Sequence, residues 1–172
     1  MCGSRLSNRT LLTSNSNLSN SNKKDITMYR EWIERLTEGN RWAGVREACS
    51  EADIRRAEEY VGFSFPEELK ALLSETDGDG WFLLSAARII EHARLNREIY
   101  PEYLEPDEFE EKVNRFVYFA TNGCGDYYCY RVLPSGETDD TAICIWEHEL
   151  FETREVAKNI PELITRYYND EI

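Results

Sequence analysis

Apolar residues recur at helical spacing in the first half of the chain. Tyr29–Leu36 carries apolar side chains three or four residues apart, which predicts a short helix. Ser50 is a typical N-cap and Gly62 a typical C-cap, and the apolar stripe between them predicts a second helix. Pro66 suits the first position of a third helix. The buried face of that helix is expected to contain Leu69, Leu72 and Leu73.

The segment that follows changes conformation several times over a short length. Asp77-Gly-Asp-Gly80 has the composition of a turn. A calcium loop starting at Asp77 is excluded, because Trp81 and Arg88 would stand where oxygen ligands are required. Trp81–Leu84 is interpreted as a short strand, and Ser85 as the cap of a fourth helix. Apolar residues of that helix are Ile89, Ile90, Ala93 and Leu95.

The second half of the chain is dominated by aromatic and β-branched runs. Phe116–Ala120, Tyr127–Leu133 and Ala142–Trp146 predict three strands. The turn at 134–136 makes the third strand antiparallel to the second. Val156–Tyr168 predicts a closing helix. Helices followed by strands indicate an α+β fold, in which a mostly antiparallel sheet is covered by helices.

The first 27 residues differ from the rest. Residues 4–22 are rich in Ser and Asn and show no apolar period, so residues 1–27 are expected to form a disordered tail. They contain no continuous apolar run of the kind found in secretory signals. A second hypothesis is that translation starts at Met28, because codons for Lys23-Lys24-Asp25 can spell a purine-rich ribosome-binding site. Residues 28–172 are then the single expected domain.

The charge of the chain narrows the choice of partners. The 172 residues include 20 Lys+Arg and 33 Asp+Glu, with a net charge of −13. Residues 1–27 hold four basic residues and one acidic residue, so residues 28–172 carry a net charge of −16. This excess of acid argues against a general nucleic-acid surface and against an anionic membrane. A basic protein is the electrostatic match.

Two groups of residues suggest catalysis or metal binding. Zinc could be held by Cys124, Cys129, Cys144 and His148, but their spacing is not that of a zinc site. Strand alternation places Cys129 and Cys144 in mid-strand, where they fill small apolar spaces. Glu147-His148-Glu149 is the best acid–base cluster, although no nucleophile elbow or phosphate loop accompanies it. We expect no cofactor and no metal, and keep a small hydrolase or metal protein centred on His148 as a third hypothesis.

Acidic and aromatic residues gather between Tyr100 and Glu111. Carboxylates can steer a basic partner, and exposed tyrosines can anchor an interface. The predicted steering charges are Glu102, Glu105, Asp107 and Glu108, and the predicted anchors are Trp81, Tyr100 and Tyr103. The alternative is that the acidic surface serves solubility alone.

Four segments in the same order, at residues 54–73, 119–130, 145–149 and 156–157, resemble the SUKH superfamily. The last of them, Val156-Ala157, is similar to the start of the family's closing helix. Ile54–Leu73 is similar to its pattern I-x-x-x-E-x-x-(apolar)-G-x-x-(apolar)-P-x-x-(Y/L)-K-x-(apolar)-L, although many members carry an aromatic residue at the position of Leu69. Phe119–Tyr130 resembles its F-A-x-x-G-x-G-D-x-(Y/F) segment, and Ile145–Glu149 its W-x-H-E strand end. The motif positions are Gly62, Pro66, Gly125, Asp126, Tyr128, Trp146, His148 and Glu149.

The resemblance implies an α+β fold and a function without catalysis. Bacterial members are largely cytoplasmic immunity proteins that bind a cognate toxin, often a nuclease. Fungal relatives are scaffolds that regulate cell-wall assembly. We therefore expect an immunity protein that neutralises a basic toxin by binding it, without contacting nucleic acid or membrane itself. A regulatory scaffold of the Smi/Knr type is the alternative, and the motif residues are expected to shape the domain.

Overall fold

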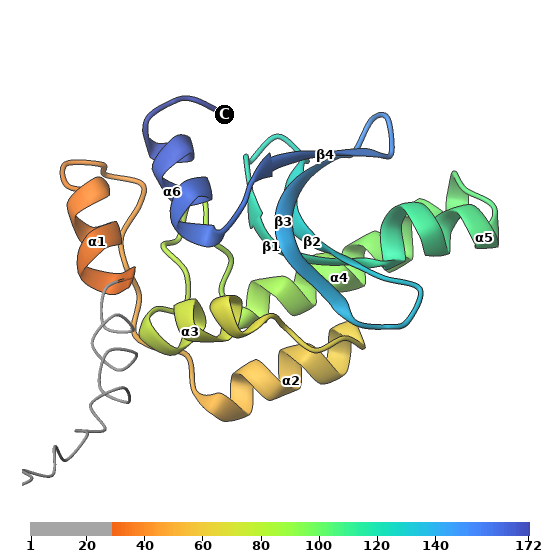
Figure 1. Ribbon diagram of the computed structural model, residues 1–172, viewed down its shortest axis with the longest axis horizontal. Coiled ribbons are helices and arrows are strands. Elements are labelled where there is room, and N and C mark those ends of the chain that lie inside the picture. Colours follow the sequence, from red (N-terminus) through yellow and green to blue (C-terminus); the bar gives the residue numbers. More distant parts are fainter. Residues whose placement is uncertain (1–28) are drawn as a thin grey trace, which may run out of the picture.

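The computed structural model describes residues 29–172 as a curved sheet flanked by helices (Figure 1). The predicted tail, residues 1–27, and the alternative start at Met28 lie outside the described residues. The sheet contains β1 (Phe116–Thr121), β2 (Tyr127–Val132), β3 (Thr138–Glu147) and β4 (Glu152–Ala157). The strands stand in sequence order and each neighbouring pair is antiparallel. The predicted antiparallel pairing of the second and third strands is thereby confirmed. The fold is therefore α+β.

The main hydrophobic core lies between one face of the sheet and the helices. These helices are α1 (Tyr29–Leu36), α2 (Glu51–Val61), α3 (Glu67–Glu75), α4 (Ala86–Ile99) and α6 (Ile160–Tyr168). Local signals define α2, because the Ser50 hydroxyl accepts a hydrogen bond from Asp53 N and Gly62 ends the helix at φ +91°. The predictions for α1, α2 and α4 are confirmed. Among residues 29–172 no helix is long and apolar enough to cross a membrane.

The opposite face of the sheet has a second, aromatic core. Three short helical segments cover it: the 3-10 helix η1 (Tyr100–Glu102), α5 (Pro106–Phe109) and the π-helix η2 (Glu110–Asn114). Trp146 and Tyr118 are buried beneath them. Cys129 and Cys144 are also buried here, and they pair in register across β2 and β3. Their predicted place in mid-strand is confirmed.

The prolines at 101 and 106 predict a loop that continues to Glu111, and this prediction is wrong in part. The structure has a loop only at residues 103–105, between helical segments at 100–102 and 106–114. Glu105 takes the N-cap position of α5 and Pro106 occupies its first turn, where a missing amide costs no helix hydrogen bond. Pro66 is itself an N-cap, so α3 begins one residue later than the sequence predicts.

Two further predictions need correction. Trp81–Leu84 is not a strand, because the Asp79 carboxylate accepts the amides of residues 81–83 and leaves one isolated bridge, Leu83 with Ala120. The closing helix begins at Ile160, where Asn159 caps it. The residues before it form β4, which completes a hairpin with β3.

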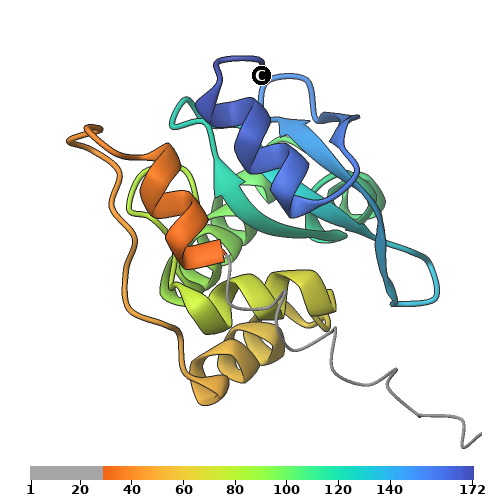
Figure 2. The ribbon, with the colours of Figure 1, turned by 60° about the vertical axis from the view of Figure 1, so that its left-hand side comes forward.

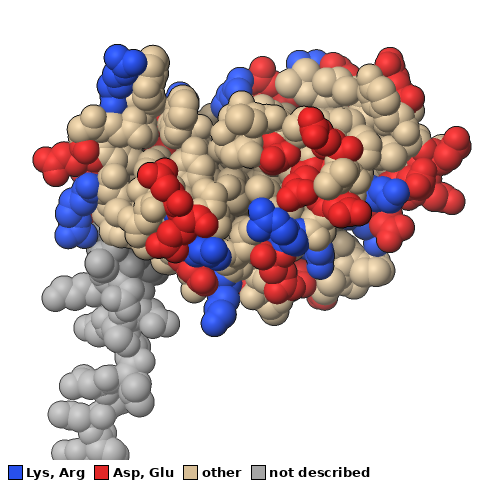
Figure 3. Space-filling model, turned by 90° about the horizontal axis from the view of Figure 1, so that it is seen from above, with Lys and Arg blue, Asp and Glu red and all other residues tan. Residues whose placement is uncertain are grey.

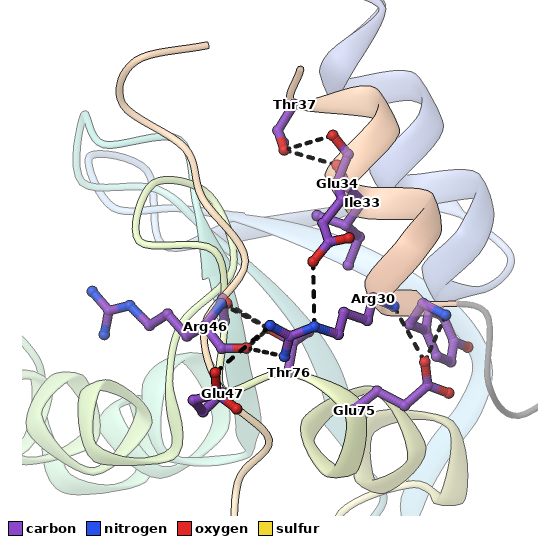
Figure 4. A network of polar contacts seen from close by, with 10 residues as sticks. Arg30, Ile33, Glu34, Thr37, Arg46, Glu47, Glu75 and Thr76 are labelled. Atoms are coloured by element: carbon purple, nitrogen blue, oxygen red, sulfur yellow. Dashed lines mark hydrogen bonds and ion pairs between the residues drawn. The ribbon is translucent and has the colours of Figure 1, made fainter. Parts of the chain in front are cut away.

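Helix α1 is fastened to the end of α3. The backbone amides of Tyr29 and Arg30 donate to Glu75 Oε2 at 2.8 and 3.2 Å (Figure 4). Ile33, on the inner face of α1, is fully buried. Arg30 Nη1 donates to the carbonyl of Arg46 at 2.9 Å. Figure 2 shows α1 beside α6. The helix is thus an integral part of the domain.

Candidate protein-binding site

Residues 100–114, here called the acidic segment, are held firmly on their inner side. Trp146 Nε1 donates to the carbonyl of Lys112 at 2.6 Å, and Tyr118 OH donates to that of Val113 at 2.7 Å. Tyr100 packs edge-on against Trp146 and Phe151, with ring centroids 5.3 and 5.4 Å apart. The backbone that carries the acidic side chains therefore has a defined position before any partner arrives.

The outer side of the acidic segment is a cluster of carboxylates. Those exposed are Glu102, Glu105, Asp107, Glu108 and Glu111. Glu108 pairs with Lys112 at 2.9 Å, and the hydrogen bond and charge of that lysine lower the pKa of Glu108. The other four form no ion pair with any described residue. Acidic side chains gather at the end of the molecule where α5 lies (Figure 3).

An apolar element accompanies these charges. Tyr103 is 69% exposed, whereas Tyr100 is half-buried in the second core. Tyr103 lines an open depression of about 580 Å³ together with Leu104 and Phe109. Of the two tyrosines, Tyr103 has the geometry of an interface anchor, and Tyr100 instead supports the segment from inside.

Trp81 lies far from the acidic segment. It precedes the N-terminus of α4, whereas Tyr100 follows its C-terminus. A 14-residue helix is about 21 Å long, so the structure does not bring Trp81 to the predicted carboxylates. Its neighbour is Trp42, which is not among the residues predicted from sequence to form a site. The two indole rings stack with centroids 6.3 Å apart.

His148 is held by the turn between β1 and β2. Its backbone amide and Nδ1 lie 3.1 and 2.8 Å from Asp126 Oδ1, and Asn122 Nδ2 donates to Asp126 Oδ2 at 2.9 Å. Burial raises the pKa of Asp126, but the hydrogen bonds from His148 and Asn122 outweigh it and hold the pKa below its usual value. Gly125 has φ +107°, and a Cβ there would lie 2.8 Å from the imidazole. The motif positions Gly125, Asp126 and His148 thus form one packed unit.

The side chains near His148 can be compared with those of catalytic and metal sites. Within the described residues, no Ser or Cys side chain forms a hydrogen bond with His148, as an activated nucleophile would. No three His, Cys, Asp or Glu side chains of residues 29–172 are placed to hold a metal ion. Cys124 is exposed in a turn, whereas Cys129 and Cys144 lie in the second core. Burial raises the pKa of the Cys129 thiol well above its ordinary value.

Most of the remaining motif positions lie at helix ends or in the two hydrophobic cores. Gly62 and Pro66 cap helices, and Tyr128 and Trp146 are buried on opposite faces of the sheet. Glu149 is exposed in the turn between β3 and β4.

Comparison with known proteins matches most of this domain to one family. Residues 48–166 match the family model described as SMI1 / KNR4 family (SUKH-1). The match begins just before α2 and ends within α6, so α1 and the segment to Glu47 precede it. No curated protein matches the chain.

Proposed function

Because the chain belongs to the SMI1 / KNR4 (SUKH-1) family, we propose that it is an immunity protein that neutralises a cognate toxin. It acts by stoichiometric binding rather than by catalysis. It works in the cytoplasm of the cell that produces the toxin. Family membership fits an immunity protein or a Smi/Knr-type protein, and the surface of this chain favours the first.

The observation that carries the proposal is the rigid acidic segment. Four of its exposed carboxylates have no ion pair with a described residue, so their field acts outward. Such a field raises the association rate with a basic partner and orients it during approach. Tyr103 and the depression beside it supply apolar contact area for the docked state.

A nuclease is the toxin class that this surface suits best. Nucleases bind phosphates, and phosphate binding relies on exposed Lys and Arg. A domain with a net charge of −16 over residues 28–172 complements such a surface. By covering the basic cleft, it would exclude the nucleic acid without touching it.

The proposal predicts that an adjacent reading frame encodes a large toxin. The C-terminal domain of that toxin is expressed with and without this chain, and rescue of growth is expected. The variant E102Q/E105Q/D107N removes three unpaired carboxylates of the acidic segment. The control E31Q/E38Q/E59Q removes three exposed acids elsewhere that also have no ion pair with a described residue.

Stopped-flow binding separates steering from general charge. At low salt we expect the acidic-segment variant to associate about tenfold more slowly than wild type, with its dissociation rate nearly unchanged. The control variant should associate at close to the wild-type rate. Equal slowing by both variants would contradict the assigned surface. A folded protein that rescues no growth would instead favour the regulatory scaffold.

A further inference from the structure

Two tryptophans form an exposed aromatic platform at the end of α4 opposite the acidic segment. Trp42 is 60% exposed and Trp81 is 49% exposed, yet their rings are stacked at an angle of 27°. The guanidinium of Arg41 lies over the Trp42 ring, 4.4 Å from its centroid. Leaving two large aromatic rings in water is costly, and such pairs mark binding sites in other proteins.

The loops that carry the tryptophans are rigid. Residues 44–49 run beside residues 73–79, joined by Gly44 N to Asp79 O at 2.7 Å and Asp77 N to Glu47 O at 2.8 Å. The buried Asp79 carboxylate accepts three amides, including that of Trp81, and a hydrogen bond from Tyr168 OH. A Cβ on Gly78 would lie 2.5 Å from the carbonyl of Leu83. The platform is therefore preorganised, and little entropy is lost when a partner docks.

The chemistry beside the platform is basic, although the domain as a whole is acidic. A pocket of about 270 Å³ next to Trp81 is lined by Arg46 and Arg88. The Arg46 guanidinium has no acidic partner among the described residues, and Figure 4 shows it pointing away from the network around Arg30. Within residues 29–172, Arg88 forms one ion pair, with Glu91. The first amides of α4 are already taken by Asp77 and Ser85, so an anion here would bind the guanidinium groups.

We propose that this surface docks an acidic segment of a partner protein. One carboxylate side chain enters the pocket and bonds Arg46 and Arg88, while an apolar side chain covers the Trp42–Trp81 stack. The pocket is smaller than most cofactor sites, which occupy 300–1,000 Å³, but it accommodates one acidic side chain. Arginine favours this partner because its guanidinium binds carboxylates in a bidentate manner.

The platform lies partly outside the family match. Arg41, Trp42 and Arg46 all precede residue 48, where the family match begins. The Trp42 ring and the backbone at Gly44 and Arg46 pack against residues 77–85, which lie inside the match. The inference does not depend on the proposed toxin.

A defined peptide probe tests the proposal with the full chain. The probe is a fluorescent peptide of sequence EWDLEEADFE, which does not occur in this chain and combines six acids with apolar residues, and its counterpart has every acid replaced by the amide. We expect the acidic peptide to bind about tenfold more tightly at low salt. Variants W42A and R46E/R88Q should lose most of this binding. The control R55E/R56Q, which makes the same charge change at exposed positions of α2, should retain it.

The possible results distinguish an acidic partner segment from a second copy of this chain as the molecule bound to the platform. Equal binding of both peptides, or equal loss in R55E/R56Q and R46E/R88Q, would overturn the proposal. Sedimentation velocity of the full chain shows whether a second copy binds to the platform. We expect the chain to sediment as a monomer. Concentration-dependent self-association that disappears in R46E/R88Q would assign the surface to self-assembly and so also overturn it. Neither measurement uses a toxin, so failure of this inference leaves the proposed function untouched.

Discussion

Replacing Gly125 by Ala should destabilise the domain far more than the same change at Gly123. Both glycines have positive φ, +107° and +77°, so each substitution costs about 1–3 kcal/mol of backbone strain. Around Gly123 nothing lies within 4 Å of the new Cβ. At Gly125 the Cβ would lie 2.8 Å from Cε1 and Nδ1 of His148. The imidazole must move, and it then loses its hydrogen bond to Asp126.

The extra cost at Gly125 is about 1–3 kcal/mol, since a partly buried hydrogen bond to a carboxylate is broken. Urea denaturation measures both variants and the double variant G125A/H148A, in which the ring is absent. The double variant should recover part of the difference, because the ring contact no longer exists. If G125A and G123A unfold at the same urea concentration, the packed unit at His148 contributes little and the reasoning fails.

Three further predictions concern other parts of the domain. Glu75→Ala removes the acceptor for the first amides of α1, so α1 should exchange its amide hydrogens faster and the domain lose about 1 kcal/mol; unchanged exchange would contradict this anchor. In a Cys2→Ser background, the exposed Cys124 should react rapidly with a thiol reagent. Cys129 should react only after unfolding, because burial raises the pKa of its thiol. Rapid modification of Cys129 in the native protein would contradict its burial. The pKa of Asp126 lies below its usual 3.8 in the folded state, so its ionised form contributes stability above that pH and loses it as pH falls through the native pKa. The stability gap between wild type and Asp126→Asn should therefore be constant near neutral pH and close in acid, and denaturation midpoints that fall in parallel over the whole range would exclude this linkage.

The elements predicted well from sequence are those with local signals. Ser50 and Gly62 mark the ends of α2 because the cap residues bond to their own helix. The boundary between β4 and α6 was missed for the opposite reason. Val156, Ile160 and Leu163 fit a helical stripe as well as they fit a strand followed by a helix. Pairing with β3, which a local pattern does not contain, decides between the two.

The candidate sites likewise combine features that follow from local sequence with features that depend on contacts between distant residues. The acidic segment is evident from sequence, because its charges are contiguous. Its helical form depends on Trp146, which is more than thirty residues away along the chain. The Trp42–Trp81 stack was missed because backbone contacts between distant loops create it. The only sequence signal was a tryptophan in a short polar stretch, Gly39-Asn40-Arg41-Trp42.

The outer edge of β4 has a consequence for the behaviour of the protein at high concentration. The outer edge of β1 is met by the Leu83–Ala120 bridge, whereas β4 pairs with β3 alone among the strands that the structure describes. An open edge invites a strand from another molecule and can start aggregation. Glu152, Arg154 and Glu155 are exposed along this strand, and a neighbouring strand would have to bury their charges against its own backbone. The alternation of sign keeps the edge well hydrated, so the chain can reach high concentration without β4 pairing edge to edge with a strand of another molecule.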